Sequence, residues 1–458
     1  MSFATSDPQQ PDFSVNVIGN IQSKPKVLYV KPDSKATAQT PNYGLSWATA
    51  YPSFQTALHA AKPGNEIWVA AGTYKPTQDY DQTISFVMPE DVGIYGGFAG
   101  TETTRQQRNI TTHPTILSGA LSETKYSNHI VMGGNYGVLD GFTISDGNRH
   151  GPYRPIPPGG GMYNTSVSLT VNKCVFAEIN VGGGIGDGKG GAIYNGSVLS
   201  TFSNCVFATN TLIAGYADIG PRGMGGAIYN DALSSSTITN SVFCGNLAIG
   251  GEYAGPGMGG AIYNEGRLTL TNCTLFSNKA GGGSPSWTVV PGGRNGPDIV
   301  YGQPGPAYGG ALYSHGGAVY VTNCIFWDNV DQYVLWGVLH YASAIQNDSA
   351  TMIYKNNDIE GCRGSGSTWK WSYGGDGGGN FELDPWFVNQ ANPAGPDGIW
   401  MTTDDGLRLR SNSLCINHGT NTGAPTTDIL GKARISIVDM GSYEFQYGNA
   451  AGQWALYR

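Results

Sequence analysis

Gly225-Gly226-Ala227-Ile228-Tyr229-Asn230 is one of three identical hexapeptides in this chain, and the other two span residues 190–195 and 259–264. Residues 159–164 (Gly-Gly-Gly-Met-Tyr-Asn) and 309–314 (Gly-Gly-Ala-Leu-Tyr-Ser) are near-copies. The tyrosines of the five copies are spaced by 31, 35, 34 and 50 residues. Such an irregular period is typical of a solenoid whose coils share their strands and differ in the length of their loops.

A second repeated element follows each hexapeptide. In residues 202–207, Phe-Ser-Asn-Cys-Val-Phe, apolar side chains alternate with other residues, which is typical of a half-buried strand. Matching segments span residues 170–176, 239–243, 271–275 and 322–326. Most units then close on an asparagine, at Asn210, Asn246, Asn278 and Asn329. We expect these asparagines at turns, where Asn tolerates a left-handed backbone and bonds to the next coil. Short strands joined by Gly and Asn turns predict an all-β protein, a right-handed parallel β-helix of roughly ten coils.

We divide the chain into four segments on this basis. Residues 1–26 form a polar N-terminal tail, and residues 27–135 form an N-terminal cap with the first coils. Residues 136–350 form the repeat region, and residues 351–458 form the C-terminal coils with a loop-rich cap. Residues 54–61 are the one convincing short helix, and we expect it to cover the first coil, whose open edge would otherwise invite aggregation.

The N-terminal tail bears on the location of the protein. It lacks a charged segment followed by an apolar run, so it does not have the pattern of a secretory signal. An extracellular or cell-surface location would mean that a signal has been removed from this chain, and a virion protein would need none. Phe13, Val15 and Val17 alternate as in a strand. We expect this strand to pair with a sheet edge of its own chain or of a neighbouring copy, as in self-assembly.

The composition and charge of the chain argue against a nucleic-acid partner and against a membrane span. Gly accounts for 69 of 458 residues and charged residues for 13%, a profile typical of turn-rich all-β proteins. The net charge is −8 and the basic residues are scattered, so we expect no nucleic-acid partner. The chain has no apolar run of the length that a membrane span requires, so we expect no membrane span.

The chain contains seven cysteines. Cys174, Cys205, Cys273 and Cys324 occupy the same place in successive units, which would suit a row of metal ligands or of disulfides. A disulfide between stacked parallel strands would be strained, and no Cys-x-x-Cys spacing occurs. We therefore expect buried free thiols that pack as small apolar groups.

The loops that run into each hexapeptide hold the candidate binding residues. Because these loops leave the solenoid at one corner, we expect them to stack into a single wall. Aromatic faces stack on sugar rings, while acidic and basic groups bind hydroxyls or uronate carboxylates. The candidate substrate-binding residues are Arg154, Asp187, Lys189, Arg222, Glu252, Trp287, Arg294, Asp298 and Tyr301. The alternative is a set of solvated loop tips with an occasional surface ion pair.

Two kinds of catalysis would suit such a wall. Asp187 with Asp218 or Glu252 would provide the two carboxylates of a glycoside hydrolase. Lys189 or Arg222 would provide the base of a polysaccharide lyase. No motif supports either scheme, and the sequence names no catalytic residue.

Two segments near the C-terminus also contain candidate ligands. Residues 392–398 and 402–406 combine Asp and Asn oxygens with Gly turns, the ingredients of a calcium loop, with Asp397, Asp404 and Asp405 as candidate ligands. Bound Ca²⁺ would fix the C-terminal loops in place, and the alternative is a run of Asx turns.

Trp369 and Trp371 form either a binding platform or a plug for the end of the solenoid.

Two resemblances cover most of the chain. The Gly-Gly-Ala-Ile and Phe-x-x-Asn combination over residues 136–330 resembles the repeat of polymorphic outer-membrane proteins, which are surface adhesins and autotransporter passengers. The flanks, in particular residues 64–74 and 439–444, resemble bacterial secreted β-helix proteins of the pectate-lyase-like superfamily with a choice-of-anchor Q region. A Ser-Pro-x-Ile-Asp segment usual in the latter reads Ser-Leu-Cys-Ile-Asn at residues 413–417.

These resemblances imply two functions. The first is a cell-surface or virion-surface protein that engages a polysaccharide or host surface, or assembles into arrays, through the stacked loops. The alternative is a polysaccharide lyase or glycoside hydrolase that uses the same loops. The fold does not separate them, because this scaffold supports both.

Overall fold

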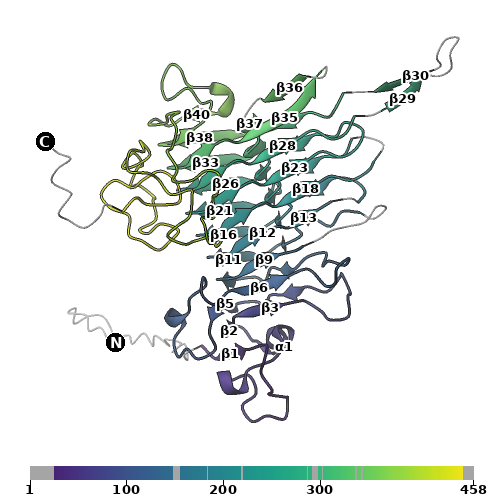
Figure 1. The fold of residues 1–458 in the computed structure, drawn as a ribbon, viewed down its shortest axis with the longest axis vertical. Helices are drawn as coiled ribbons and strands as arrows, with labels where there is room; N and C mark the ends of the chain where they lie inside the picture. The colour runs from purple at the N-terminus through teal and green to yellow at the C-terminus, as the bar shows by residue number, and fades with distance from the viewer. Residues whose placement is uncertain are drawn as a thin grey trace, which may run out of the picture.

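The computed structural model describes residues 25–147, 155–182, 184–217, 220–285, 287–290, 298–301, 303–335, 338–341 and 344–446. The chain forms a right-handed parallel β-helix, as predicted, with its coils stacked along the long axis (Figure 1). The tail strand expected around Val15 lies outside the described residues.

Five sheets of four or more strands run along the solenoid. Sheet A contains β1 (Val27–Val30), β2 (Glu66–Ala70), β5 (Gly93–Phe98), β8 (Gly137–Asp140), β11 (Ser168–Asn172), β16 (Leu199–Ser203), β21 (Ser235–Thr239), β26 (Arg267–Thr271), β33 (Ala318–Thr322), β38 (Thr351–Lys355) and β40 (Gly375–Asp376). Sheet B contains β3 (Gly72–Tyr74), β6 (Thr115–Ser118), β9 (Thr143–Ser145), β12 (Val175–Ala177), β17 (Val206–Ala208), β22 (Val242–Cys244), β27 (Thr274–Phe276), β34 (Ile325–Trp327) and β39 (Asp358–Ile359). Sheet C contains β4 (Phe86–Val87), β7 (Val131–Met132), β10 (Met162–Thr165), β15 (Ile193–Gly196), β20 (Ile228–Asn230), β25 (Ile262–Asn264), β32 (Leu312–His315) and β37 (Ile345–Asp348).

The two smaller sheets lie on the side of the repeat loops. Sheet D contains β13 (Asn180–Val181), β18 (Thr211–Ile213), β23 (Leu247–Ile249), β28 (Lys279–Gly281), β35 (Val330–Leu335) and β36 (Val338–Tyr341). Sheet E contains β14 (Gly188–Lys189), β19 (Gly223–Met224), β24 (Gly257–Met258) and β31 (Ala307–Tyr308). The remaining elements are the hairpin of β29 (Trp287–Val290) and β30 (Asp298–Tyr301), the helix α1 (Phe54–Ala60) and the 3₁₀ turns η1 (Trp47–Thr49), η2 (Arg105–Gln107) and η3 (Trp371–Tyr373).

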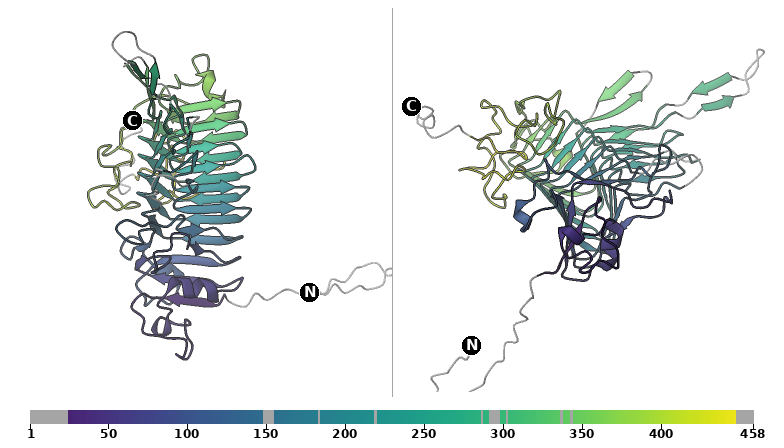
Figure 2. Two further views of the ribbon diagram at one scale, coloured as in Figure 1. Left: turned by 90° about the vertical axis from the view of Figure 1, so that its right-hand side faces the viewer. Right: turned by 60° about the horizontal axis from the view of Figure 1, so that its bottom comes forward.

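The core follows the predicted register. The fully buried column of Phe176, Phe207, Phe243, Leu275 and Phe326 is aligned from strand to strand in sheet B. The predicted cysteine column is equally buried, and all seven cysteines of the chain are free thiols. The side view in Figure 2 shows how evenly the coils stack.

The predicted asparagine ladder is present at the turn between sheets B and D. Each amide of Asn210, Asn246 and Asn278 donates to the side-chain oxygen of the next asparagine at 2.8–2.9 Å. The left-handed backbone, however, belongs to the preceding residue, as in Thr209 with φ 53°. The buried asparagine therefore serves the ladder, and its exposed neighbour makes the turn.

Helix α1 covers the N-terminal end of the solenoid, as predicted. The hydroxyl of Ser53 accepts a hydrogen bond from the backbone N–H of Thr56 and caps the helix. Phe54, Ala57 and Leu58 are buried in the main core cluster. The helix thus adds an apolar lid to the first coils.

The two tryptophans near the C-terminal end have different roles. Trp369 is buried beside Tyr354 and Tyr373, and its indole N–H donates to the carbonyl of Gly374 at 2.7 Å. It closes the end of the solenoid. Trp371 is 68% exposed, so its ring is accessible to a partner.

Residues 384–446, which we call the C-terminal segment, lie along the side of the solenoid rather than across its end (Figures 1 and 2, yellow). Their apolar side chains, such as Phe387, Leu407 and Met440, pack on the outer face of sheet B. Val206 and Ile325 on that face are almost completely buried. The loop-rich C-terminal region expected from the sequence therefore covers a sheet face.

Four turn asparagines attach this segment to the solenoid. They lie between sheets A and B with φ between 45° and 55°. Each side-chain amide donates to a backbone carbonyl of the C-terminal segment. The four pairs are Asn240 with Thr427, Asn272 with Asp439, Asn323 with Thr420 and Asn356 with His418.

Three buried carboxyls lie in the same contact region. The Sγ–H of Cys415 donates to Asp358, the hydroxyl of Tyr443 donates to Asp405, and backbone N–H groups donate to Asp439. Burial is the main cause that raises the pKa of each of these aspartates to about 7. The ordinary value is 3.8.

This arrangement predicts a stability that falls as the pH rises. A carboxyl with a raised pKa in the folded state contributes stability that is fully present below its ordinary pKa and is lost as the pH rises through about 7. We expect a higher melting temperature at about pH 5 than at about pH 8. The melting temperature of the Asp405→Asn variant should depend less on pH than that of the parent protein. At about pH 8 the variant should melt at a higher temperature than the parent.

The comparison of variant with parent is the decisive measurement. Burial lowers the pKa of His129 from its ordinary value of 6.5. This histidine therefore lowers the stability of the folded protein as the pH falls below 6.5, which opposes the effect of the aspartates. Both proteins contain this histidine, so it cancels in the difference. Parallel profiles for the two proteins would contradict the role given to Asp405.

Candidate functional site

The loops between sheets D and E are hydrogen-bonded to one another from coil to coil. Backbone N–H groups of Tyr216, Gly251 and Gly283 donate to carbonyls of Gly184, Pro221 and Gly255 at 2.8–3.0 Å. The predicted stack therefore exists among the described residues, and we call it the loop wall. Figure 1 shows these loops beyond β13, β18, β23 and β28.

A groove of about 970 Å³, here called the loop groove, crosses four successive coils of this wall. Ile213 and Ile249 point outward from paired positions on β18 and β23 and line it. Ile185 and Tyr216, also paired, continue the lining in the loops beyond. Ile213 and Ile185 are each 42% exposed and Tyr216 is 49% exposed, so these apolar surfaces face solvent.

Tyr216 and Tyr253 form a pair at the loop groove. Their rings meet edge to face with centroids 5.5 Å apart, and their hydroxyl oxygens are 2.8 Å apart. Glu252, exposed, lies next to this pair in the chain and lines the groove. The groove therefore combines apolar faces, an aromatic ring, hydroxyls and one carboxylate.

The other charged candidates of the wall are bound to protein groups. The guanidinium of Arg222 donates twice to one oxygen of Asp187, at 2.7 and 3.0 Å, and its backbone N–H donates to the other oxygen at 2.7 Å. The Nζ of Lys189 lies 5.1 Å from the ring centroid of Tyr229. The structure thus brings Asp187 and Arg222 together as an ion pair, and of these candidates only Glu252 lines the groove.

The repeat tyrosines stack along the outer face of sheet C. Neighbouring rings from Tyr163 to Tyr313 lie 5.2–5.4 Å apart and nearly parallel. Met224 and Met258 of sheet E cover three of them. Burial is the main cause that raises the pKa of Tyr194. These tyrosines are packing groups of the solenoid.

Six candidate residues lie in parts of the chain that are described incompletely or not at all. Arg154 and Arg294 lie outside the described residues, as does Asp218. Trp287 and Tyr301 are paired in the antiparallel hairpin β29–β30, and Asp298 begins its second strand. The side chains of these three residues are outside the described part. The hairpin itself projects from the coils (Figure 1).

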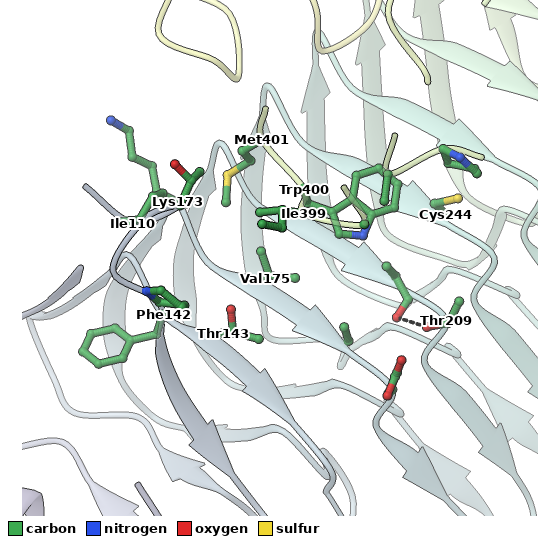
Figure 3. Close-up of a pocket in the computed structure, with 18 of the residues that line it drawn as sticks. Ile110, Phe142, Thr143, Lys173, Val175, Thr209, Cys244, Ile399, Trp400 and Met401 are labelled. Carbon is green, nitrogen blue, oxygen red and sulfur yellow. Dashed lines mark hydrogen bonds between the residues drawn. The ribbon is translucent and has the colours of Figure 1, made fainter. Parts of the chain in front are cut away.

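A second concave site, the side groove, lies between the outer face of sheet B and residues 392–401 (Figure 3). Its volume is about 520 Å³. Val175 and Thr143 continue the row that Val206 begins beneath the C-terminal segment. Trp400 and Met401 supply the opposite wall (Figure 3).

Sequence reasoning missed the side groove, although a signal for it exists. Val206-Phe207-Ala208 and Val242-Phe243-Cys244 are apolar at every position. A strand without alternation is buried on both faces, which indicates that another part of the chain covers its outer side. The pattern does not say which part.

The three candidate calcium ligands bind donors of their own chain. Asp405 is buried and accepts from the N–H of Met401 and the hydroxyl of Tyr443 at 3.0 and 2.7 Å. Asp404 accepts from the hydroxyl of Thr402, and Asp397 accepts from the N–H of Ile399. Within the described ranges, no group of three or more His, Cys, Asp or Glu side chains is arranged to hold a metal ion. Calcium binding here stays a prediction.

Comparison with known proteins places the chain in a family. Residues 38–273, more than half of its 458 residues, match one family model. The chain belongs to DUF1565, a family described as proteins of unknown function. No curated protein matches the sequence.

Among solved structures, this DUF1565 protein is similar to pectate lyase Pel9A. The two share 14% identity over 93% of this chain and 97% of that one, with a TM-score of 0.40. A rhamnogalacturonan lyase has 10% identity over 84% and 97%, with a TM-score of 0.38. Pectin methylesterase from carrot has 10% identity over 81% and 92%, with a TM-score of 0.37. The TM-scores of these three structures are 0.40 or lower, so the likenesses are distant and carry no argument about activity.

No helix among the described residues is long and apolar enough to cross a membrane.

Proposed function

We propose that this protein binds an extended polysaccharide and that the loop groove is its binding site. The observation that carries this proposal is the continuity of the groove over four coils, with exposed isoleucines and Tyr216 along it. Stacked strands repeat at about 4.8 Å along the solenoid axis, so the groove offers a series of similar contacts. A polymer of repeated sugar units presents a matching series of apolar faces and hydroxyls.

Each group of the groove has a role in this complex. The ring of Tyr216 and the side chains of Ile213 and Ile249 cover the apolar faces of sugar rings. The hydroxyls of Tyr216 and Tyr253 exchange hydrogen bonds with sugar hydroxyls.

The side-chain arrangement favours binding over cleavage. A hydrolase needs two carboxylates that converge on one bond, and a lyase needs a free base. Here Asp187 accepts three hydrogen bonds from Arg222, and Lys189 lies against Tyr229. Cleavage by a polysaccharide lyase or glycoside hydrolase remains the alternative outcome of the test below.

The proposal includes a location and an assembly. A polysaccharide-binding solenoid acts outside the cell, on a cell surface or on a virion, where such polymers occur. The resemblances to choice-of-anchor and polymorphic outer-membrane repeat proteins support an adhesin of this kind. Calcium on the C-terminal segment and arrays formed through the N-terminal tail belong to the same proposal.

The Tyr216→Ala variant tests the site. We expect polysaccharide binding to weaken about tenfold, because the ring supplies roughly 1.5 kcal/mol of stacking. The melting temperature should stay unchanged, since the side chain is exposed. A glycan array and affinity electrophoresis in polysaccharide gels measure binding, and reducing-end and unsaturated-product assays on the same samples measure cleavage.

The matched control is Trp371→Ala, which removes an exposed aromatic ring from the C-terminal end of the solenoid. It should leave binding unchanged. Loss of binding in Trp371→Ala with retention in Tyr216→Ala would move the site to that end and overturn the proposal.

A further inference from the structure

We infer that the loop groove takes a neutral polysaccharide and rejects polyuronates; this inference rests on the proposed function. It narrows the ligand class through the charges that line the groove. The described lining residues include one ionisable carboxylate, Glu252, and no lysine, arginine or histidine.

Arg222 and Lys189, two cations of the repeat coils, do not line the groove. Arg222 is paired with Asp187, which accepts two hydrogen bonds from its side chain and one from its backbone, so the pair adds no net charge. The Nζ of Lys189 in sheet E lies 5.1 Å from the ring centroid of Tyr229 in sheet C.

A polyuronate in the loop groove would therefore face unfavourable charges. Its carboxylates would approach Glu252, and the described lining residues offer no cation to pair with them. The net charge of −8 adds repulsion at longer range. An exposed carboxylate suits a neutral sugar, because its two oxygens can accept hydrogen bonds from neighbouring hydroxyls of the sugar. Hydrogen bonds to a charged acceptor are stronger than those between neutral groups.

Matched polymers test this inference. The probes are polygalacturonate with its carboxyl-reduced form, and β-1,4-glucuronan with β-1,4-glucan oligomers. The members of each pair differ at C6 only. We expect the neutral member of at least one pair to bind about tenfold or more tightly than its acidic partner. The difference should shrink at high salt, because screening weakens repulsion and leaves stacking in place.

Two variants separate charge from shape. Glu252→Lys should raise the affinity for the acidic polymers about tenfold. Glu123→Lys makes the same change of net charge at an exposed position outside the groove lining. This variant should leave the ratio of the affinities for neutral and acidic polymers unchanged.

The outcomes distinguish the two proposals. Tighter binding of an acidic polymer than of its neutral partner by the parent protein would overturn the inference and leave polysaccharide binding in place. Equal effects of the two lysine variants would also overturn it. If the parent binds none of the four polymers and nothing on the glycan array, the proposed function itself falls, and the inference falls with it.

Discussion

Replacing Phe207 with Ala is expected to lower the free energy of unfolding by about 3–5 kcal/mol. The ring is fully buried and lies flat between Phe176 and Phe243, with centroid distances of 5.2 and 4.6 Å. Phe202 meets its edge at 6.1 Å. The neighbouring coils are fixed by backbone pairing, so they cannot collapse into the space left by the ring. Chemical unfolding followed by tryptophan fluorescence measures the loss.

Two controls define this effect. Phe207→Leu keeps most of the volume and should cost clearly less than the alanine substitution. Leu199→Ala removes a side chain that is 62% exposed on sheet A and should change stability by about 0.5 kcal/mol or less. A similar small loss for Phe207→Ala would mean that the stack is not close-packed.

The Arg434→Met variant should lose about 3–5 kcal/mol and detach the C-terminal segment from the coils. Arg434 and Glu444 are each 1% exposed and paired at 2.9 Å. The same guanidinium donates to Asn240 of the solenoid at 2.8 Å and to the carbonyl of Gly441 at 3.0 Å. Methionine leaves Glu444 buried without its cation. Limited proteolysis should then cut the C-terminal segment before the solenoid.

A double variant shows whether charge or shape is responsible. Adding Glu444→Gln to Arg434→Met removes the unpaired charge and should recover part of the lost stability. Arg410→Met is the matched single control, since Arg410 is exposed and its side chain donates to the carbonyl of Val388. Equal losses in Arg434→Met and Arg410→Met would contradict the role of the buried pair.

The repeat region was predictable because its information is local and repeated. Each copy of Gly-Gly-Ala-Ile-Tyr-Asn enters sheet C at the same register, and the phenylalanine column follows from the same alignment. The position of the C-terminal segment was not predictable in this way. Its attachments join residues far apart in the chain, such as Asn240 and Thr427, which are 187 positions apart. Nothing in either residue specifies the other.

The candidate site was predicted in part for a similar reason. The repeat grouped Asp187, Lys189, Arg222 and Glu252; the structure pairs Asp187 with Arg222 across neighbouring loops and places Glu252 in the groove lining. The sequence could not show that Arg222 turns to Asp187, because pairing depends on how the loops lie across one another. Ile213 escaped notice because an outward isoleucine in a short strand has the same sequence pattern as an inward one.

The side-on position of the C-terminal segment also sets an order of events during synthesis. The coils can wind as they leave the ribosome, yet Val206 and Ile325 stay bare on sheet B until residues 384–446 emerge to cover them. At translation rates of about 5–20 residues per second, that delay lasts on the order of 10 s. During this interval the nascent solenoid exposes an apolar surface on sheet B that is buried in the folded protein, and chaperones would bind it there.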